Sequence, residues 1–239
     1  MSREPLDALL VVQGHDTNLD QLRHRLATLD ERTTRDEATA RLDAVRAEAA
    51  TVGAERDELA RRLKRIEDEV ASIDDKRKQH DARLYGGTVT NARELQDLQE
   101  EVDSLGRRIT QLEDEELELM EQLEPLDERL AALAADEATA GAALDAAELA
   151  LTAAEAEIGA ALDAEAARRD EAGAGVDAAL LAHYETLRAG GGGVGIARLA
   201  GGNRCGGCHL TLSAVQVAAL KKQTDAVAHC EECGRILVP

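Results

Sequence analysis

Four cysteines form two pairs near the C-terminal end of the sequence, in Cys205-Gly-Gly-Cys208 and Cys230-Glu-Glu-Cys233. The two pairs are separated by 21 residues, a spacing that is typical of a tetrahedral four-thiolate zinc site. Each Cys-x-x-Cys turn delivers two sulfurs to one ion, and glycines inside the first turn and directly after the second supply the backbone freedom that such turns need. The spacing therefore predicts one zinc ion, bound by all four cysteines.

Four thiolates fill the coordination shell of zinc and leave no position for water or substrate. The predicted ion is therefore structural, and its binding helps to fold a segment with few large apolar residues. Two disulfides or a redox-active dithiol are alternatives for the same cysteines. His209 and His229 each adjoin a cysteine, so either could also replace a sulfur as a ligand.

The residues around the cysteines predict a small zinc ribbon. Strands are expected at 194–199, 226–229 and 235–238, and Ser213 is placed to cap a short helix over 213–223. The glycine run after Ala189 is not a phosphate-binding loop, because no Gly-Lys-Ser/Thr follows it and no strand precedes it. The sequence therefore predicts three parts: a coiled-coil helical region at 1–189, a glycine-rich linker at 190–195 and the C4 zinc ribbon at 196–239.

A 3.5-residue apolar repeat fills most of the helical region. Steps of three and four residues from Leu95 to Ala161 visit 20 positions, of which 18 are Leu, Ile, Val or Ala; the exceptions are Glu116 and Glu137. A similar repeat runs from Leu42 to Leu84. This period is that of a left-handed coiled coil, in which the apolar seam of each helix must pack against a partner.

The break between the two repeats, LYGGTVTN at 84–91, identifies that partner as the other half of the same chain. The Gly-Gly pair permits positive φ, and Asn91 followed by Glu94 predicts an N-cap and capping box for a new helix. The predicted fold is therefore mainly α, a long antiparallel coiled-coil helical hairpin followed by a small β-rich ribbon. At its tip, near 85–91, Tyr85 and Val89 are predicted to bind a partner; the alternative is that they pack only on each other.

Large apolar residues are absent from 33–41, and the heptad phase slips there. If residue i faces roughly residue 175−i, the opposite stretch at 134–143 also lacks leucine. Two facing gaps predict a section of the seam with little buried area.

The composition excludes several classes of protein. The chain has no Phe, no Trp and only two Tyr, so a thick globular core is not expected. Of the net charge of −20, the first 189 residues carry −22, which repels nucleic acid and anionic membranes. The last 50 residues carry +2, and only their basic residues could contact phosphate: Arg198, Arg204, Lys221, Lys222 and Arg235.

The sequence begins without the apolar region of a signal peptide and contains no run of about 18 apolar residues. We therefore expect a cytoplasmic protein that does not enter a membrane. The remaining histidines are scattered, with no carboxylate or nucleophile at motif spacing, so no enzymatic activity is expected. The oligomeric state is left open.

The chain resembles a bacterial family of coiled-coil proteins with a C-terminal C4-type zinc ribbon, formerly a domain of unknown function. The resemblance covers nearly the whole chain and is carried by four segments: 85–96, 184–188, 205–209 and 230–237. It implies a helical hairpin followed by a ribbon, and some relatives resemble chaperones or adaptors of flagellar and secretion systems. This chain departs from the family in its alanine-rich second arm and its four-glycine linker.

Two functions are consistent with these features. The first is a non-catalytic adaptor or chaperone-like protein, whose tip or ribbon binds other proteins. The second is a transcription-associated factor that binds DNA or RNA through the ribbon. The second is weakened by the small positive charge of the ribbon and by its lack of aromatic residues that could stack on bases.

Overall fold

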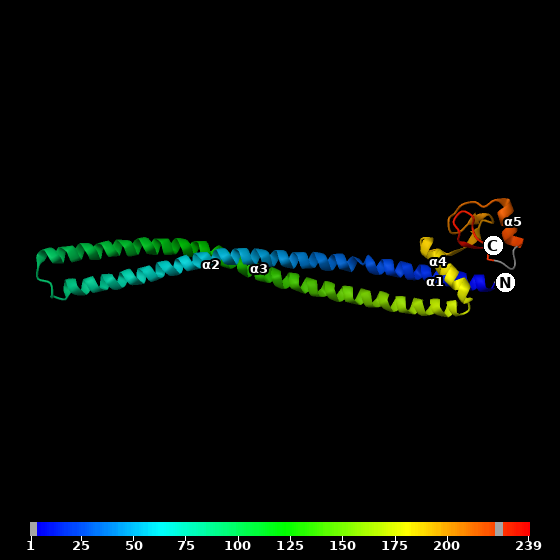
Figure 1. The fold of residues 1–239 in the computed structure, drawn as a ribbon. Coiled ribbons are helices and arrows are strands. Elements are labelled where there is room, and N and C mark those ends of the chain that lie inside the picture. The colour runs from blue at the N-terminus through cyan, green and yellow to red at the C-terminus, as the bar shows by residue number, and fades with distance from the viewer. Residues whose placement is uncertain (1–3, 223–226) are drawn as a thin grey trace. The chain divides into compact units, whose positions relative to one another are not determined.

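A computed structural model describes residues 4–222 and 227–239. The elements follow the chain in the order α1 (Glu4–Ala27), α2 (Asp30–Tyr85), α3 (Ala92–Ala174), α4 (Ala178–Gly190), β1 (Ile196–Ala200), β2 (Arg204–Cys205), α5 (Ala214–Lys222) and β3 (Ile236–Val238) (Figure 1). This is the predicted helical hairpin followed by a small β-containing ribbon. Two compact units divide the chain: Arg35–Ala147 forms one, and the residues before and after it form the other.

In the unit Arg35–Ala147, α2 and α3 pack antiparallel along the predicted apolar seam. Its buried apolar side chains are Leu42, Val45, Leu98, Ile109, Leu112, Leu119, Leu123, Leu133, Ala140 and Ala147. Two of the polar residues that interrupt the seam, Arg56 and Glu137, form ion pairs between the helices. Arg56 Nε lies 3.0 Å from a carboxylate oxygen of Asp127, and Arg46 Nε lies 2.7 Å from one of Glu137. Such pairs fix the register of one helix against the other.

The register differs from the predicted one. Paired residue numbers add up to 183 for Arg46 with Glu137 and to 177 for Glu69 with Arg108, two to eight more than the rough value of 175 that was expected. The stretch opposite 35–41 therefore reaches Ala147. Its fully buried seam positions are Ala140 and Ala147, and Leu144 between them is half-buried. The seam is thin here because its side chains are small.

The tip is an irregular loop between Tyr85 and Ala92. Gly87 adopts a φ of +70°, which explains the need for glycine in this turn. Asn91 caps α3 as predicted, because its side-chain oxygen accepts a 3.0 Å hydrogen bond from the Arg93 N–H. In place of the predicted capping box, the Glu94 carboxylate accepts a hydrogen bond from Arg83 across the tip.

Helix α4 is an element that the repeat did not predict. The second arm was expected to continue to residue 188, but α3 ends at Ala174 and α4 begins after Asp177. The Asp177 carboxylate caps α4 by accepting hydrogen bonds from the N–H groups of Ala179 and Leu180, at 3.0 and 3.2 Å. The first arm is also broken, between Ala27 and Asp30, whereas α3 continues through Pro125.

A three-stranded sheet of order β2-β1-β3 forms the ribbon, with β1 antiparallel to β2 and parallel to β3. The strands predicted at 194–199 and 235–238 are present with slightly different ends. The strand predicted at 226–229 is wrong within the described residues, which contribute only an isolated bridge between His229 and Ile236. Ser213 caps α5 through a reciprocal pair of hydrogen bonds with Gln216. Residues 223 and 226 lie outside the described part of the chain.

The two faces of the sheet belong to two apolar cores. We call the first the shared core, because it joins α1, α4 and the sheet; its members are Leu9, Val12, Val176, Leu180, Tyr184, Ile196, Ile236 and Val238. We call the second the ribbon core; its members are Ala197, Cys205, Leu212, Leu220, Cys230 and Leu237.

None of the helices within 4–222 and 227–239 is both long and apolar enough to span a bilayer.

Candidate metal centre

The first cysteine turn begins at the end of β2. The Cys205 carbonyl accepts a 2.9 Å hydrogen bond from the His209 N–H, which closes the turn. Gly206 donates its N–H to the Arg198 carbonyl of β1 at 2.9 Å. A Cβ on Gly206 would lie 2.6 Å from that carbonyl oxygen, so only glycine permits this close approach.

The second turn repeats the same backbone design. The Cys230 carbonyl accepts a 2.8 Å hydrogen bond from the Gly234 N–H, and the Cys230 N–H donates to the Arg235 carbonyl at 2.9 Å. The residue after the second cysteine has positive φ in both turns, +72° at Gly234 and +63° at His209. This conformation suits glycine, so His209 adopts it at a steric cost.

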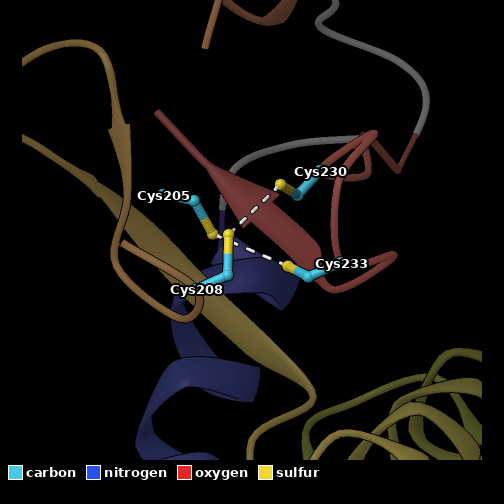
Figure 2. Close-up of side chains that lie close together, drawn as sticks. All are labelled: Cys205, Cys208, Cys230 and Cys233. Atoms are coloured by element: carbon cyan, nitrogen blue, oxygen red, sulfur yellow. Dashed lines mark hydrogen bonds between the residues drawn. The ribbon is translucent and has the colours of Figure 1, made fainter. Parts of the chain in front are cut away.

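The four sulfurs converge on one point (Figure 2). All four Sγ atoms lie within 4.8 Å of one another, and the Cys205–Cys233 and Cys208–Cys230 Sγ distances are both 3.9 Å. A tetrahedral zinc site with bonds of about 2.3 Å requires sulfurs about 3.8 Å apart. The site therefore fits one structural zinc ion, as predicted, and because a disulfide requires about 2.05 Å, neither of these pairs is a disulfide.

The protein environment treats the thiols differently. Burial raises the pKa of the Cys230 thiol to about 12. Burial also acts on Cys233, but hydrogen bonds from the backbone and side chain of Arg235 and from the Cys230 and Cys208 thiols together outweigh it. They lower the pKa of the Cys233 thiol to about 7. Because zinc binds thiolates, loading the site must release protons from thiols such as Cys230.

The neighbouring histidines have other roles. Neither His209 nor His229 belongs to the described metal-ligating cluster, which consists of cysteines alone. The His229 Nδ1 lies 3.0 Å from the Gly234 carbonyl oxygen, and its ring packs edge-on against His183 of α4 at a centroid distance of 5.2 Å. His229 therefore supports the second turn and contacts α4.

Comparison with known proteins agrees with this geometry. The model of the CT398-like coiled coil hairpin domain matches residues 12–192, and that of the C4-type zinc ribbon domain matches residues 204–237. The chain belongs to the CT398-like coiled-coil hairpin family. The family resemblance drawn from the tip and the two cysteine turns is thereby confirmed.

Relatives of the family extend over nearly the full chain. The uncharacterized protein Rv2229c of Mycobacterium tuberculosis H37Rv is 34% identical, over 97% of this chain and 94% of that protein. A solved structure from Mycobacterium smegmatis matches with a TM-score of 0.90 at 28% identity, over 100% of this chain and 98% of that one. CT398 from Chlamydia trachomatis matches with a TM-score of 0.72 at 19% identity, over 99% and 98% of the two chains, and supports the fold alone.

Two of the basic residues proposed to contact nucleic acid make contacts within the chain. Arg235 donates from Nε to the Val194 carbonyl at 2.8 Å and also to the Gly191 carbonyl. Arg198 Nη2 lies 2.6 Å from a carboxylate oxygen of Asp7 on α1. These two guanidinium groups therefore connect the ribbon to the segments that precede it.

The other basic residues are exposed. Arg204 donates only a long 3.4 Å hydrogen bond, to the His209 carbonyl, and Lys221 and Lys222 end α5.

At the tip, Tyr85 is 78% exposed and Val89 is half-buried. A tyrosine with this exposure does not pack mainly on its neighbour, which disfavours the alternative that the two residues only cover each other.

Buried polar groups form a cluster around α1 that the apolar repeat did not predict. Asp16 is 5% exposed and accepts a 2.7 Å hydrogen bond from the hydroxyl of the fully buried Tyr184. Its other carboxylate oxygen lies 3.3 Å from Arg169 Nε, and Arg188 Nε lies 3.7 Å from the carboxylate. Burial, and then the hydrogen bond to Asp16, raise the pKa of Tyr184, which keeps its hydroxyl protonated as a donor.

A second buried acid lies near the first. Glu165 accepts hydrogen bonds from Asn18 at 2.7 Å and Arg168 at 3.0 Å, and His15 Nδ1 lies 2.9 Å from the same carboxylate. These contacts, led by that of His15, lower the pKa of Glu165 to about 2. Both acids occupy positions of the heptad repeat, so the spacing could have identified them. Asp16 continues the series Leu9 and Val12, and Glu165 continues the series that ends at 161.

Proposed function

We propose that this protein is a non-catalytic adaptor that uses the tip of its helical hairpin to bind other proteins. The metal site supports a role without catalysis, because four sulfurs complete the tetrahedral shell and leave no position for a substrate. The zinc site then stabilises the fold rather than reacting.

The observation that carries this proposal is the exposed aromatic side chain at the tip. Tyr85 is one of only two tyrosines in a chain without Phe or Trp, and 78% of it faces solvent. The other tyrosine, Tyr184, is completely buried. Tyrosines concentrate binding energy in protein interfaces, because they bury a large area at a small cost in conformational entropy.

Tyr85 is the last residue of α2, and the loop that follows it is anchored at both ends. Asn91 caps the following helix, and Arg83 bridges to Glu94 at 3.3 Å across the loop. A pre-ordered loop loses less entropy on binding than a mobile one. Partner proteins with an apolar pocket for one aromatic ring would therefore suit this surface.

Site-specific crosslinking tests the proposal. A photoreactive amino acid at position 85 should capture discrete partner proteins in the native cell, whereas the same group at the exposed Glu58 on the flank of α2 should not. Replacing 85–90 by a Gly/Ser loop should leave helicity unchanged and abolish capture in a pull-down with the full chain. Unchanged capture by that variant would refute a role for the tip. Capture that disappears with nuclease would favour the alternative of nucleic-acid binding.

A further inference from the structure

The sheet of the ribbon separates the metal site from the helices. Successive residues of a strand point to opposite faces. Ile196 and Ile236 therefore enter the shared core with α1 and α4, while Ala197 and Leu237 enter the ribbon core with the cysteines. Strands whose positions depend on the metal site thus also cover the apolar side chains of α1 and α4.

The segment predicted as a linker is tied to α1. The Gln13 side-chain amide donates to the Gly193 carbonyl at 2.9 Å, and its oxygen accepts from the Gly195 N–H at 2.8 Å. Arg235, placed between the second cysteine turn and β3, holds the same segment from the other side through the Val194 carbonyl. Movement of the cysteine turn therefore changes contacts that reach α1.

Tyr184 lies directly against this segment. A Cβ on Gly195 would be 2.7 Å from the Tyr184 ring, so the ring contacts the backbone where the chain enters β1. Tyr184 also contributes its hydroxyl to Asp16 of α1. The backbone at Gly195 thus helps to hold α4 on α1.

The ribbon core is too small to hold the sheet without the metal. Its largest buried side chains are Leu212, Leu220 and Leu237, and two of its six members are cysteines. Small domains with cores of this size depend on a metal or disulfides for their stability. Loss of zinc should therefore disorder the sheet and remove its half of the shared core.

We propose that zinc in the ribbon acts as a latch on α1 and α4. With four thiolates bound, the sheet covers an apolar surface that includes Leu9, Val12 and Tyr184. When the metal is withdrawn, that surface is uncovered and α4 is released from α1. The metal state of the ribbon is thereby transmitted to the helical hairpin.

Hydrogen exchange on the full chain, zinc-loaded and after chelation, tests the latch. Amides in 9–19 and 180–187 should lose protection by about tenfold or more together with those of the ribbon, because local opening depends on the buried contacts that remain. Amides in 98–123 are the internal control and should not change. Loss of protection confined to the ribbon would overturn the proposal.

The reverse measurement does not require an unfolded ribbon. Coupling between two sites is reciprocal, so weakening the contact on α1 should weaken zinc binding, although Cys205 lies 192 positions further along the chain than Gln13. Gln13→Ala removes two hydrogen bonds to the linker and should raise the zinc Kd about tenfold, equivalent to about 1.4 kcal/mol. Gln21→Ala, an exposed position on the same helix, is the matched control. Competition with a chromophoric chelator measures both, and an unchanged Kd for Gln13→Ala would contradict the latch.

Discussion

Removing the Tyr184 hydroxyl tests whether the buried polar cluster holds α4 on α1. The hydroxyl donates to the Asp16 carboxylate at 2.7 Å, in a site where neither side chain is appreciably exposed. A hydrogen bond to a charged group contributes about 1.5–3 kcal/mol. Asp16 keeps its contacts with Arg169 and Arg188, so the carboxylate is not left without a partner, and we expect Tyr184→Phe to cost about 2 kcal/mol.

The assay is hydrogen exchange of α4 peptides in the zinc-loaded chain. A loss of about 2 kcal/mol corresponds to exchange about 30-fold faster. Tyr85→Phe is the matched control, because it removes the same group from an exposed side chain and should leave α4 unchanged. In an Asp16→Asn background, Tyr184→Phe should cost less than half as much, because the charged acceptor is gone. If Tyr184→Phe changes exchange by less than twofold, the cluster does not stabilise the packing of α4.

Three further predictions concern other parts of the chain. The pKa of Glu165 is lowered from 4.5 to about 2, so its contribution to stability is complete above pH 4.5 and is lost as the pH falls towards 2; Tm measured across this range should fall less steeply for Glu165→Gln than for the wild-type chain. His209 has a φ of +63°, so its substitution by glycine should leave the zinc affinity unchanged or strengthen it. Substitution by valine should weaken zinc binding by about 1–2 kcal/mol, and competition with a chelator measures both. Amides at 35–41, a stretch without large apolar side chains, should exchange faster than those around Leu112, because less apolar area is buried there. Equal protection would show that this section of the seam is no weaker.

Local rules predicted the parts of the molecule that depend on local geometry. The cysteine spacing predicted the metal site, since two short turns place their sulfurs with little help from the rest of the chain. The glycine pair and Asn91 predicted the tip for the same reason. The heptad repeat predicted two helices that pack on each other, but not their register, which depends on specific ion pairs such as Arg46 with Glu137.

Helix α4 could have been found from sequence, because Gly173 and Gly175 precede Asp177, a favoured N-cap residue. The expectation of one helical region up to residue 189 concealed it, since the residues of α4 are as apolar as those of the arm before it. Periodicity reports that a helix has a buried face, and it does not report which element covers that face.

No local rule could have predicted the shared core, because its members come from distant parts of the sequence. Ile196 and Ile236 reach Leu9 and Val12 across more than 180 residues of sequence, and nothing in a strand of five residues specifies such a distant partner. The seam positions of α1 nevertheless contain a clue. Asp16 occupies a position where an apolar residue would be expected if only another helix faced it. A carboxylate is tolerated there only when donors arrive from elsewhere. Tyr184 and Arg169 provide them, and the Arg188 guanidinium adds a positive charge with its Nε 3.7 Å away. At Asp16 one of the donors, Tyr184, belongs to a third element, α4, which leads into the zinc ribbon. Glu165 and Glu137 differ, because their partners Asn18 and Arg46 lie on the facing helix.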